Sequence, residues 1–74
     1  MKKKTTHYPS VNIEVTPEGL NKKVRIQEGW FSKAWTLAEF YIPAKSVMAE
    51  AEIIKARAKH DFGLTYDHFT YILK

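Results

Sequence analysis

Two segments in the first part of the chain alternate apolar and polar side chains. Residues 11–16 read Val-Asn-Ile-Glu-Val-Thr, and residues 23–27 read Lys-Val-Arg-Ile-Gln. A period of two is typical of a strand with one buried face. Pro17 and Gly19 lie between the segments and favour a turn, because proline presets φ and glycine accepts a positive φ. The pattern predicts a β-hairpin. Its inward side chains are Val11, Ile13, Val15, Val24 and Ile26.

A longer set of apolar residues then recurs at the three- and four-residue steps of a helix. Thr36 and Glu39 have the spacing of a capping box, and Trp35 and Phe40 have that of a hydrophobic staple in the same register. These signals predict that a long helix starts at Thr36. The apolar stripe consists of Leu37, Phe40, Tyr41, Ala44, Val47, Met48, Ala51, Ile54, Ala58 and Phe62.

Pro43 lies within this stripe, and a proline inside a helix kinks or breaks it. We expect one kinked helix, because the apolar stripe keeps its phase across Pro43. The alternative is a strand through Tyr41 and Ile42, followed by a shorter helix that Ser46 caps. Residues 49–60 are helical in both interpretations.

The end of the chain favours another strand. Gly63 is a suitable C-terminal cap for the helix, and residues 66–73 are rich in aromatic and β-branched side chains. The predicted fold is therefore α+β with the order β-β-α-β. It has a three-stranded, mostly antiparallel sheet and one long, proline-kinked helix on one face.

Charge divides the chain unevenly. Residues 1–33 hold the whole formal net charge of +4, and residues 34–74 are balanced. Residues 1–9 end at Pro9 and contain Lys2, Lys3 and Lys4, so we expect a flexible basic arm there. Residues 10–74 then form a single domain. An uneven distribution of this kind favours a partner of opposite sign, either nucleic acid or an acidic protein surface.

Several function classes are disfavoured. The chain contains no cysteine, which excludes disulfides and thiolate metal sites. No segment is apolar enough to span a membrane, and no apolar run follows the N-terminal lysines as it would in a signal peptide. We therefore expect a cytoplasmic protein.

Patterns for catalysis and metal binding are also weak. His60 and Asp61 stand six residues from the pair Asp67 and His68. If residues 66–73 form a strand, Asp67 and His68 point to opposite faces and cannot easily share one metal ion. The serines lack a neighbouring base, and no glycine-rich loop is present to bind phosphate. We expect no enzymatic activity, no metal and no cofactor.

Half of the aromatic side chains fall within residues 29–41. Those that fit the helical stripe or an inward strand position are expected in the core. They are Trp35, Phe40, Tyr41, Phe62 and Phe69. Trp30 and Phe31 lie outside both periodic patterns, beside basic residues. An exposed tryptophan in that setting is typical of an interface anchor.

Two functions from different classes remain. The first is a small non-enzymatic inhibitor or modulator that binds a larger protein, and that resembles compact regulators of phages and mobile elements in size and layout alone. Its expected binding residues are Lys22, Lys23, Arg25, Trp30, Phe31 and Lys33. The alternative is a nucleic-acid-binding protein with little sequence specificity, which would contact phosphates through Lys2, Lys3, Lys4, Lys23 and Arg25. A homodimer that buries an open sheet edge is a third arrangement.

Overall fold

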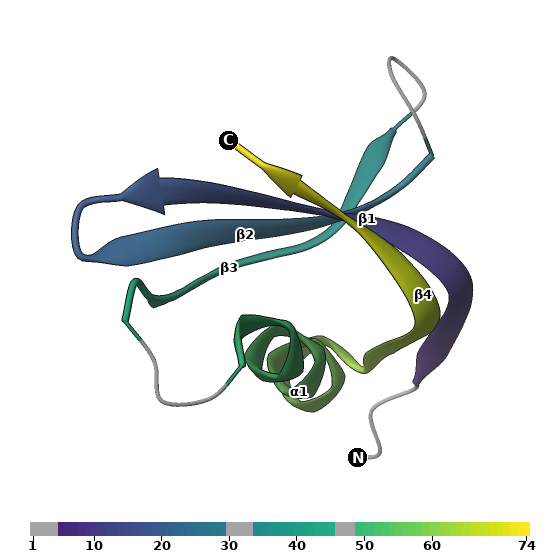
Figure 1. Ribbon diagram of the computed structural model, residues 1–74. Coiled ribbons are helices and arrows are strands. Elements are labelled where there is room, and N and C mark those ends of the chain that lie inside the picture. Colours follow the sequence, from purple (N-terminus) through teal and green to yellow (C-terminus); the bar gives the residue numbers. More distant parts are fainter. Residues whose placement is uncertain (1–4, 30–33, 46–48) are drawn as a thin grey trace.

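A mixed sheet of four strands, with one helix packed against one of its faces, forms the fold (Figure 1). The computed structural model describes residues 5–29, 34–45 and 49–74. The strand order is β3-β2-β1-β4; β1 pairs antiparallel with β2 and parallel with β4, and β2 pairs antiparallel with β3. The elements are β1 (Thr6–Glu18), β2 (Asn21–Glu28), β3 (Trp35–Pro43), α1 (Glu50–Phe62) and β4 (Leu64–Leu73).

The hairpin predicted at the start of the chain is confirmed. Glu18 pairs with Asn21, so Gly19 and Leu20 form the connection between β1 and β2. Gly19 adopts φ +64°, a left-handed conformation that costs glycine nothing. All five side chains predicted to face inward are buried. The class α+β is confirmed as well, but the sheet has four strands where a three-stranded, mostly antiparallel sheet was predicted, and its parallel pair joins β1 and β4.

The predicted kinked helix is wrong over its first part. Trp35–Pro43 forms strand β3, and α1 begins only at Glu50. Along β3, Ala38, Phe40 and Ile42 are buried while the residues between them are exposed. This alternation matches a strand. Strand β2 provides hydrogen bonds along the whole segment, and these tertiary contacts override the local capping signal of Thr36 and Glu39. The alternative of a strand followed by a shorter helix is confirmed, although Ser46 lies outside the described residues.

Strand β1 begins earlier than expected. It starts at Thr6, so the predicted arm over residues 1–9 does not extend to Pro9. From Thr6 to Val15, β1 pairs with β4, and the register passes from Tyr8 to Ser10 without pairing Pro9. Proline has no N–H to donate. Tyr8 and Val11 both pack on the core although they are three residues apart, so the strand changes its inward side at this point.

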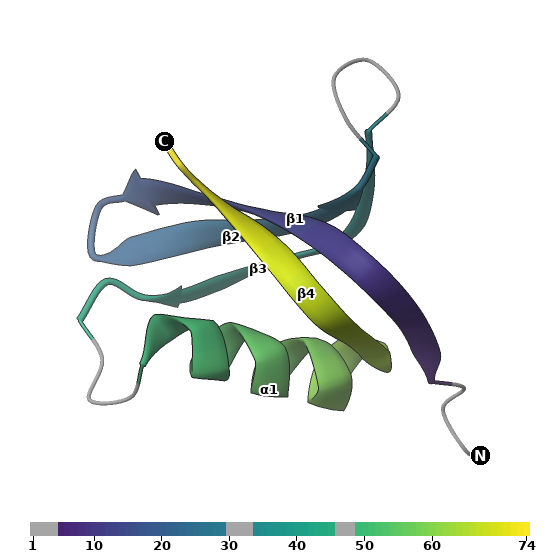
Figure 2. The ribbon, with the colours of Figure 1, turned by 45° about the vertical axis from the view of Figure 1, so that its right-hand side comes forward.

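Helix α1 covers the inward face of the sheet (Figure 2). Ile54 and Ala58 of α1 are fully buried against the strands. The prediction for Gly63 is confirmed, since it caps the helix with φ +62° and its N–H bonds the carbonyl of Lys59. Within the described residues, no helix is long and apolar enough to cross a membrane.

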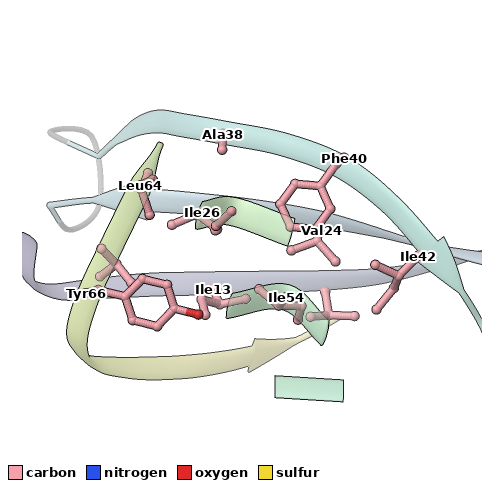
Figure 3. Packing of buried hydrophobic residues seen from close by; sticks show 12 residues of the cluster. Ile13, Val24, Ile26, Ala38, Phe40, Ile42, Ile54, Leu64 and Tyr66 are labelled. Atoms are coloured by element: carbon pink, nitrogen blue, oxygen red, sulfur yellow. The ribbon is translucent and has the colours of Figure 1, made fainter. Parts of the chain in front are cut away.

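The core lies between α1 and the sheet, and Figure 3 shows its aliphatic side chains in contact. Phe40 is buried there as predicted. The other four aromatic residues expected in the core are between 42% and 63% exposed; these are Trp35, Tyr41, Phe62 and Phe69. A helical stripe placed Tyr41 inside, but in a strand its neighbours Phe40 and Ile42 occupy the inward positions instead.

Tyr66 is the buried aromatic residue that the sequence did not predict. Its hydroxyl oxygen lies in the core, directed toward Ile13 in Figure 3, and has no hydrogen-bond partner among the described residues. Replacing Tyr66 with phenylalanine removes a desolvated hydroxyl, and we expect the free energy of unfolding to rise by about 1 kcal/mol. Urea unfolding of the two proteins measures this difference. A loss of stability in the phenylalanine variant would show that the hydroxyl has a partner in solution.

Candidate functional site

The two basic residues predicted on the outer sheet face do lie there, but both are paired with carboxylates. Arg25 donates from Nε to Oε2 of Glu39 at 3.0 Å, and its Nη1 lies 3.7 Å from Oε1 of Glu14. Lys23 Nζ lies 3.7 Å from the same Glu39 oxygen. The hydrogen bond from Arg25 holds the pKa of Glu39 below its usual value. Lys74 Nζ also lies 3.6 Å from Oε2 of Glu14, so the outer face carries a network of ion pairs instead of a free basic patch.

Lys22, an expected binding residue, is also paired with a carboxylate. It belongs to β2, and its Nζ contacts Oε2 of Glu50 at 2.6 Å, at the start of α1. The other oxygen of Glu50 accepts a hydrogen bond of 2.8 Å from the Tyr71 hydroxyl of β4. These three side chains join β2, α1 and β4. The bond from Lys22 is the main cause of a lowered pKa for Glu50, while burial and the bond to Glu50 raise the pKa of Tyr71.

The Lys22–Glu50 pair predicts a pH dependence of stability. Because the pKa of Glu50 is lower in the folded chain than in the unfolded chain, its contribution is present above the unfolded value and disappears as the pH falls. We expect Glu50→Gln to cost about 1 kcal/mol at neutral pH, the upper end for a partly exposed pair. Urea unfolding should give equal stabilities for both proteins well below pH 4.5, the ordinary pKa of a glutamate. A difference that persists in acid would mean that the charge is not its source.

The remaining predicted site residues lie outside the described residues; they are Lys2, Lys3, Lys4, Trp30, Phe31 and Lys33. All 8 acidic residues lie inside the described ranges, and 4 of the 12 basic residues do not. The described part is therefore electrically balanced. The nucleic-acid alternative stays a prediction that depends on the N-terminal lysines.

Strand β3 carries two exposed aromatic side chains that the sequence placed in the core. Trp35 is 63% exposed and Tyr41 is 48% exposed. The Trp35 indole Nε1 donates to Oε1 of Glu28 at 3.0 Å, and the Tyr41 hydroxyl donates to Oε1 of Glu18 at 3.3 Å. Neither carboxylate has a cationic partner among the described residues. Near each end of β3, an exposed aromatic ring therefore lies beside a carboxylate of another strand, Glu28 of β2 and Glu18 of β1.

This strand is also an edge of the sheet. In the order β3-β2-β1-β4, strand β3 pairs with β2 alone within the described part of the chain. Backbone N–H and C=O groups on its outer side are available to another chain. Such a row of groups is a template onto which an extended peptide adds as a further strand.

A cavity of about 390 Å³ adjoins the start of β3. Gly29 and Ala34, which line it, directly follow β2 and directly precede β3. Its wall also contains Asn12, which is 4% exposed and donates from Nδ2 to the Gly29 carbonyl at 2.7 Å. This bond fixes the end of β2 beside Trp35. Glu14, Gln27, Ile72 and Lys74 complete the lining.

One constellation of catalytic type was missed by the sequence. Parallel pairing of β1 and β4 places His7 beside Thr65, with Nδ1 and Oγ1 2.8 Å apart, and His7 Nε2 lies 3.1 Å from Oδ2 of Asp67. A hydroxyl, an imidazole and a carboxylate in this order resemble an activated nucleophile. However, the side chains of His7 and Asp67 are more than half exposed, and neither cavity found in the described part is lined by these residues. The arrangement offers a substrate no enclosed site.

Within residues 5–29, 34–45 and 49–74, no three histidine, aspartate or glutamate side chains come together as a metal-ligand set. Asp67 contacts His7, whereas His60 Nδ1 lies 2.7 Å from Oδ1 of Asp61.

Comparison with known proteins adds no family to this description. The chain matches no protein-family model, no curated protein and no solved structure.

Proposed function

We propose that this protein is a non-enzymatic binding module that docks on a larger protein through the edge of β3, as a small inhibitor or modulator does. The observation that carries the proposal is an edge strand with two exposed aromatic side chains, Trp35 and Tyr41. Main-chain hydrogen bonds along such an edge supply affinity, and exposed aromatic residues are typical energetic anchors of protein interfaces.

The proposed surface differs in part from the binding residues that the sequence predicts. Lys22, Lys23 and Arg25 already have carboxylate partners, which makes them weak candidates for contacts with a partner. Trp30, Phe31 and Lys33 precede β3 in the chain and stay predicted members of the same surface. An exposed strand edge also risks self-association, and a bound partner covers it.

A capture experiment tests the proposal. Immobilised protein is exposed to a lysate of the organism from which the chain comes, and the bound proteins are compared for the wild type and for Trp35→Ala with Tyr41→Ala. Loss of one interface anchor costs about 2 kcal/mol, which is roughly 30-fold in affinity, so we expect the double variant to capture the specific partner at least about 30-fold more weakly.

Phe69→Ala is the matched control. Phe69 is also an exposed aromatic residue, at 42%, but it belongs to β4 at the opposite edge of the sheet. The control should capture the partner as the wild type does, with circular dichroism to verify that all variants fold. Equal capture by the wild type and the β3 variant, or a specific loss in Phe69→Ala, would contradict the proposed surface.

A further inference from the structure

The cavity of about 390 Å³ lies on the sheet face that α1 leaves uncovered. Asn12 and Gln27, which line it, are directly opposite each other in the β1–β2 register. They alternate along their strands with the buried Ile13 and Ile26, which point toward α1. A volume of this size is in the range of sites for small molecules.

The wall of this cavity contains a buried amide with one unused group. Asn12 is 4% exposed, and its Nδ2 donates to the Gly29 carbonyl. Its Oδ1 accepts no hydrogen bond from the described residues. Among those residues, the Tyr66 hydroxyl is the unpartnered polar group that is sealed from solvent, so Oδ1 of Asn12 keeps access through the cavity. Because Nδ2 is committed to Gly29, Asn12 offers a ligand an acceptor alone.

Gln27 places a second amide beside this oxygen. Directly opposite residues of antiparallel strands have Cβ atoms about 5 Å apart. The Gln27 side chain makes no hydrogen bond within the described ranges, and its amide offers both N–H donors and a carbonyl acceptor. Asn12 and Gln27 therefore complement a ligand edge on which an N–H donor stands next to an acceptor.

Nucleobase edges have this arrangement, since each base presents an N–H or amino donor next to a ring nitrogen or carbonyl acceptor. A peptide bond does not, because its N–H and C=O point in opposite directions. A carboxylate only accepts hydrogen bonds and would leave Oδ1 of Asn12 without a donor. Ala34 and Ile72 also give the cavity apolar lining that a flat ring can contact.

Lys74 adds a cation to the lining. Its N–H donates to the Val15 carbonyl at 2.9 Å, which fixes its backbone beside β1. Its side chain is 53% exposed, with Nζ 3.6 Å from Oε2 of Glu14, so it is free to turn toward a ligand. Arg25 Nη1 lies 3.7 Å from Oε1 of Glu14 and keeps this carboxylate paired when Lys74 turns. An ammonium in this place suits a phosphate group.

We infer that this cavity binds a nucleotide, with the base edge at Asn12 and Gln27 and a phosphate beside Lys74. The nucleotide is either free or part of a single strand, since both present the same base and phosphate. The inference does not rest on the proposed function, because its polar contacts come from β1, β2 and the residue after β4. It would correct the sequence-based expectation that the protein binds no cofactor.

A titration of isotope-labelled protein with AMP, GMP, CMP and UMP tests the inference. NMR of the backbone amides gives both the dissociation constants and the location of the site. We expect saturable binding of at least one nucleotide, with shift changes at Asn12, Gln27 and Gly29. The matching nucleoside should bind about fivefold more weakly, because an exposed charge contact contributes up to about that factor. Inorganic phosphate alone should not cause these changes.

Two substitutions separate the base from the phosphate. Gln27→Ala should weaken nucleotide and nucleoside alike by about fivefold, the effect of one hydrogen bond. Lys74→Gln should remove the advantage of the nucleotide over the nucleoside and leave nucleoside binding unchanged. The matched controls are Thr16→Ala, outside the cavity on β1, and Lys59→Gln, an exposed lysine of α1; both should bind as the wild type does.

A short single strand of the preferred nucleotide distinguishes the two sources of the ligand. Tighter binding of the strand, in competition with the nucleotide, would support a base within a strand; no gain in affinity would support the free nucleotide.

Three results would overturn the inference. They are no saturable binding of any nucleotide, shift changes away from the cavity, and equal affinities in the wild type and Gln27→Ala. None of them affects the proposed function, whose test measures capture of a protein through β3.

Discussion

Replacing Ile42 with alanine is expected to lower the free energy of unfolding by about 2–5 kcal/mol. Ile42 is 1% exposed, near the end of β3, and packs into the cluster between the sheet and α1. Alanine removes its buried methyl groups and leaves a cavity. Folded domains of this size are stable by roughly 4–11 kcal/mol, so the loss is a large share of the total.

Tyr41→Ala is the informative control for this experiment. A helix through Thr36 would bury Tyr41 in its apolar stripe and leave Ile42 outside it, whereas the strand buries Ile42 and leaves Tyr41 48% exposed. We expect Tyr41→Ala to change stability by less than about 1 kcal/mol. Urea unfolding of both variants measures the two effects. The reverse order of destabilisation would show that residues 36–43 form a helix.

The second large effect is expected at Asn12. Its side chain is buried on the outer sheet face, and Nδ2 donates to the Gly29 carbonyl at 2.7 Å. Alanine would leave this carbonyl without its donor, and we expect the free energy of unfolding to fall by about 1–3 kcal/mol. Thr16→Ala, a partly buried position further along β1, should cost less.

The stability of the Asn12→Asp variant should depend on pH in a way that tests the role of Asn12 as a donor. An aspartate in the same buried place cannot donate to Gly29 when it is ionised, so burial favours its protonated form and raises the folded-state pKa. Stability of the variant should therefore increase as the pH falls from neutral, in contrast to the acid sensitivity expected for Glu50. A variant that is most stable at neutral pH would mean that Asn12 does not act as a donor to Gly29.

The parts of the fold that the sequence predicts are those with local causes. The β1–β2 hairpin needs only a period of two and a turn with Gly19, and both are visible in the chain. Helix α1 likewise has an apolar stripe and a glycine cap at Gly63. In these segments local preference and tertiary contacts agree, so the pattern is a sufficient guide.

The failures come from contacts between distant residues. Residues 35–43 satisfy a capping box and a strand period at the same time, and only pairing with β2 decides between them. The parallel pairing of Thr6 with Leu64 joins the two ends of the chain. Nothing in the residues near Thr6 indicates this neighbour, so the sequence predicts a flexible arm where the first residues of β1 lie.

The exposed aromatic residues of the candidate site are missed for the same reason. With a helix at Thr36, Trp35 becomes a buried staple, and its neighbour Glu28 becomes a strand end without a role. A signal was available in the sequence, since Ala38, Phe40 and Ile42 alternate with Glu39, Tyr41 and Pro43. The pairing of Lys23 and Arg25 with Glu39 could not be predicted, because it depends on the β2–β3 register.

The central claim is that β3 is the strand on which the partner adds. The most direct test is a titration of isotope-labelled protein with the partner protein that the capture experiment identifies, followed by NMR of the backbone amides. We expect the largest chemical-shift changes and new protection from hydrogen exchange along Trp35–Pro43, with small effects on β4. Changes concentrated on β4 or α1, with β3 unaffected, would contradict the account.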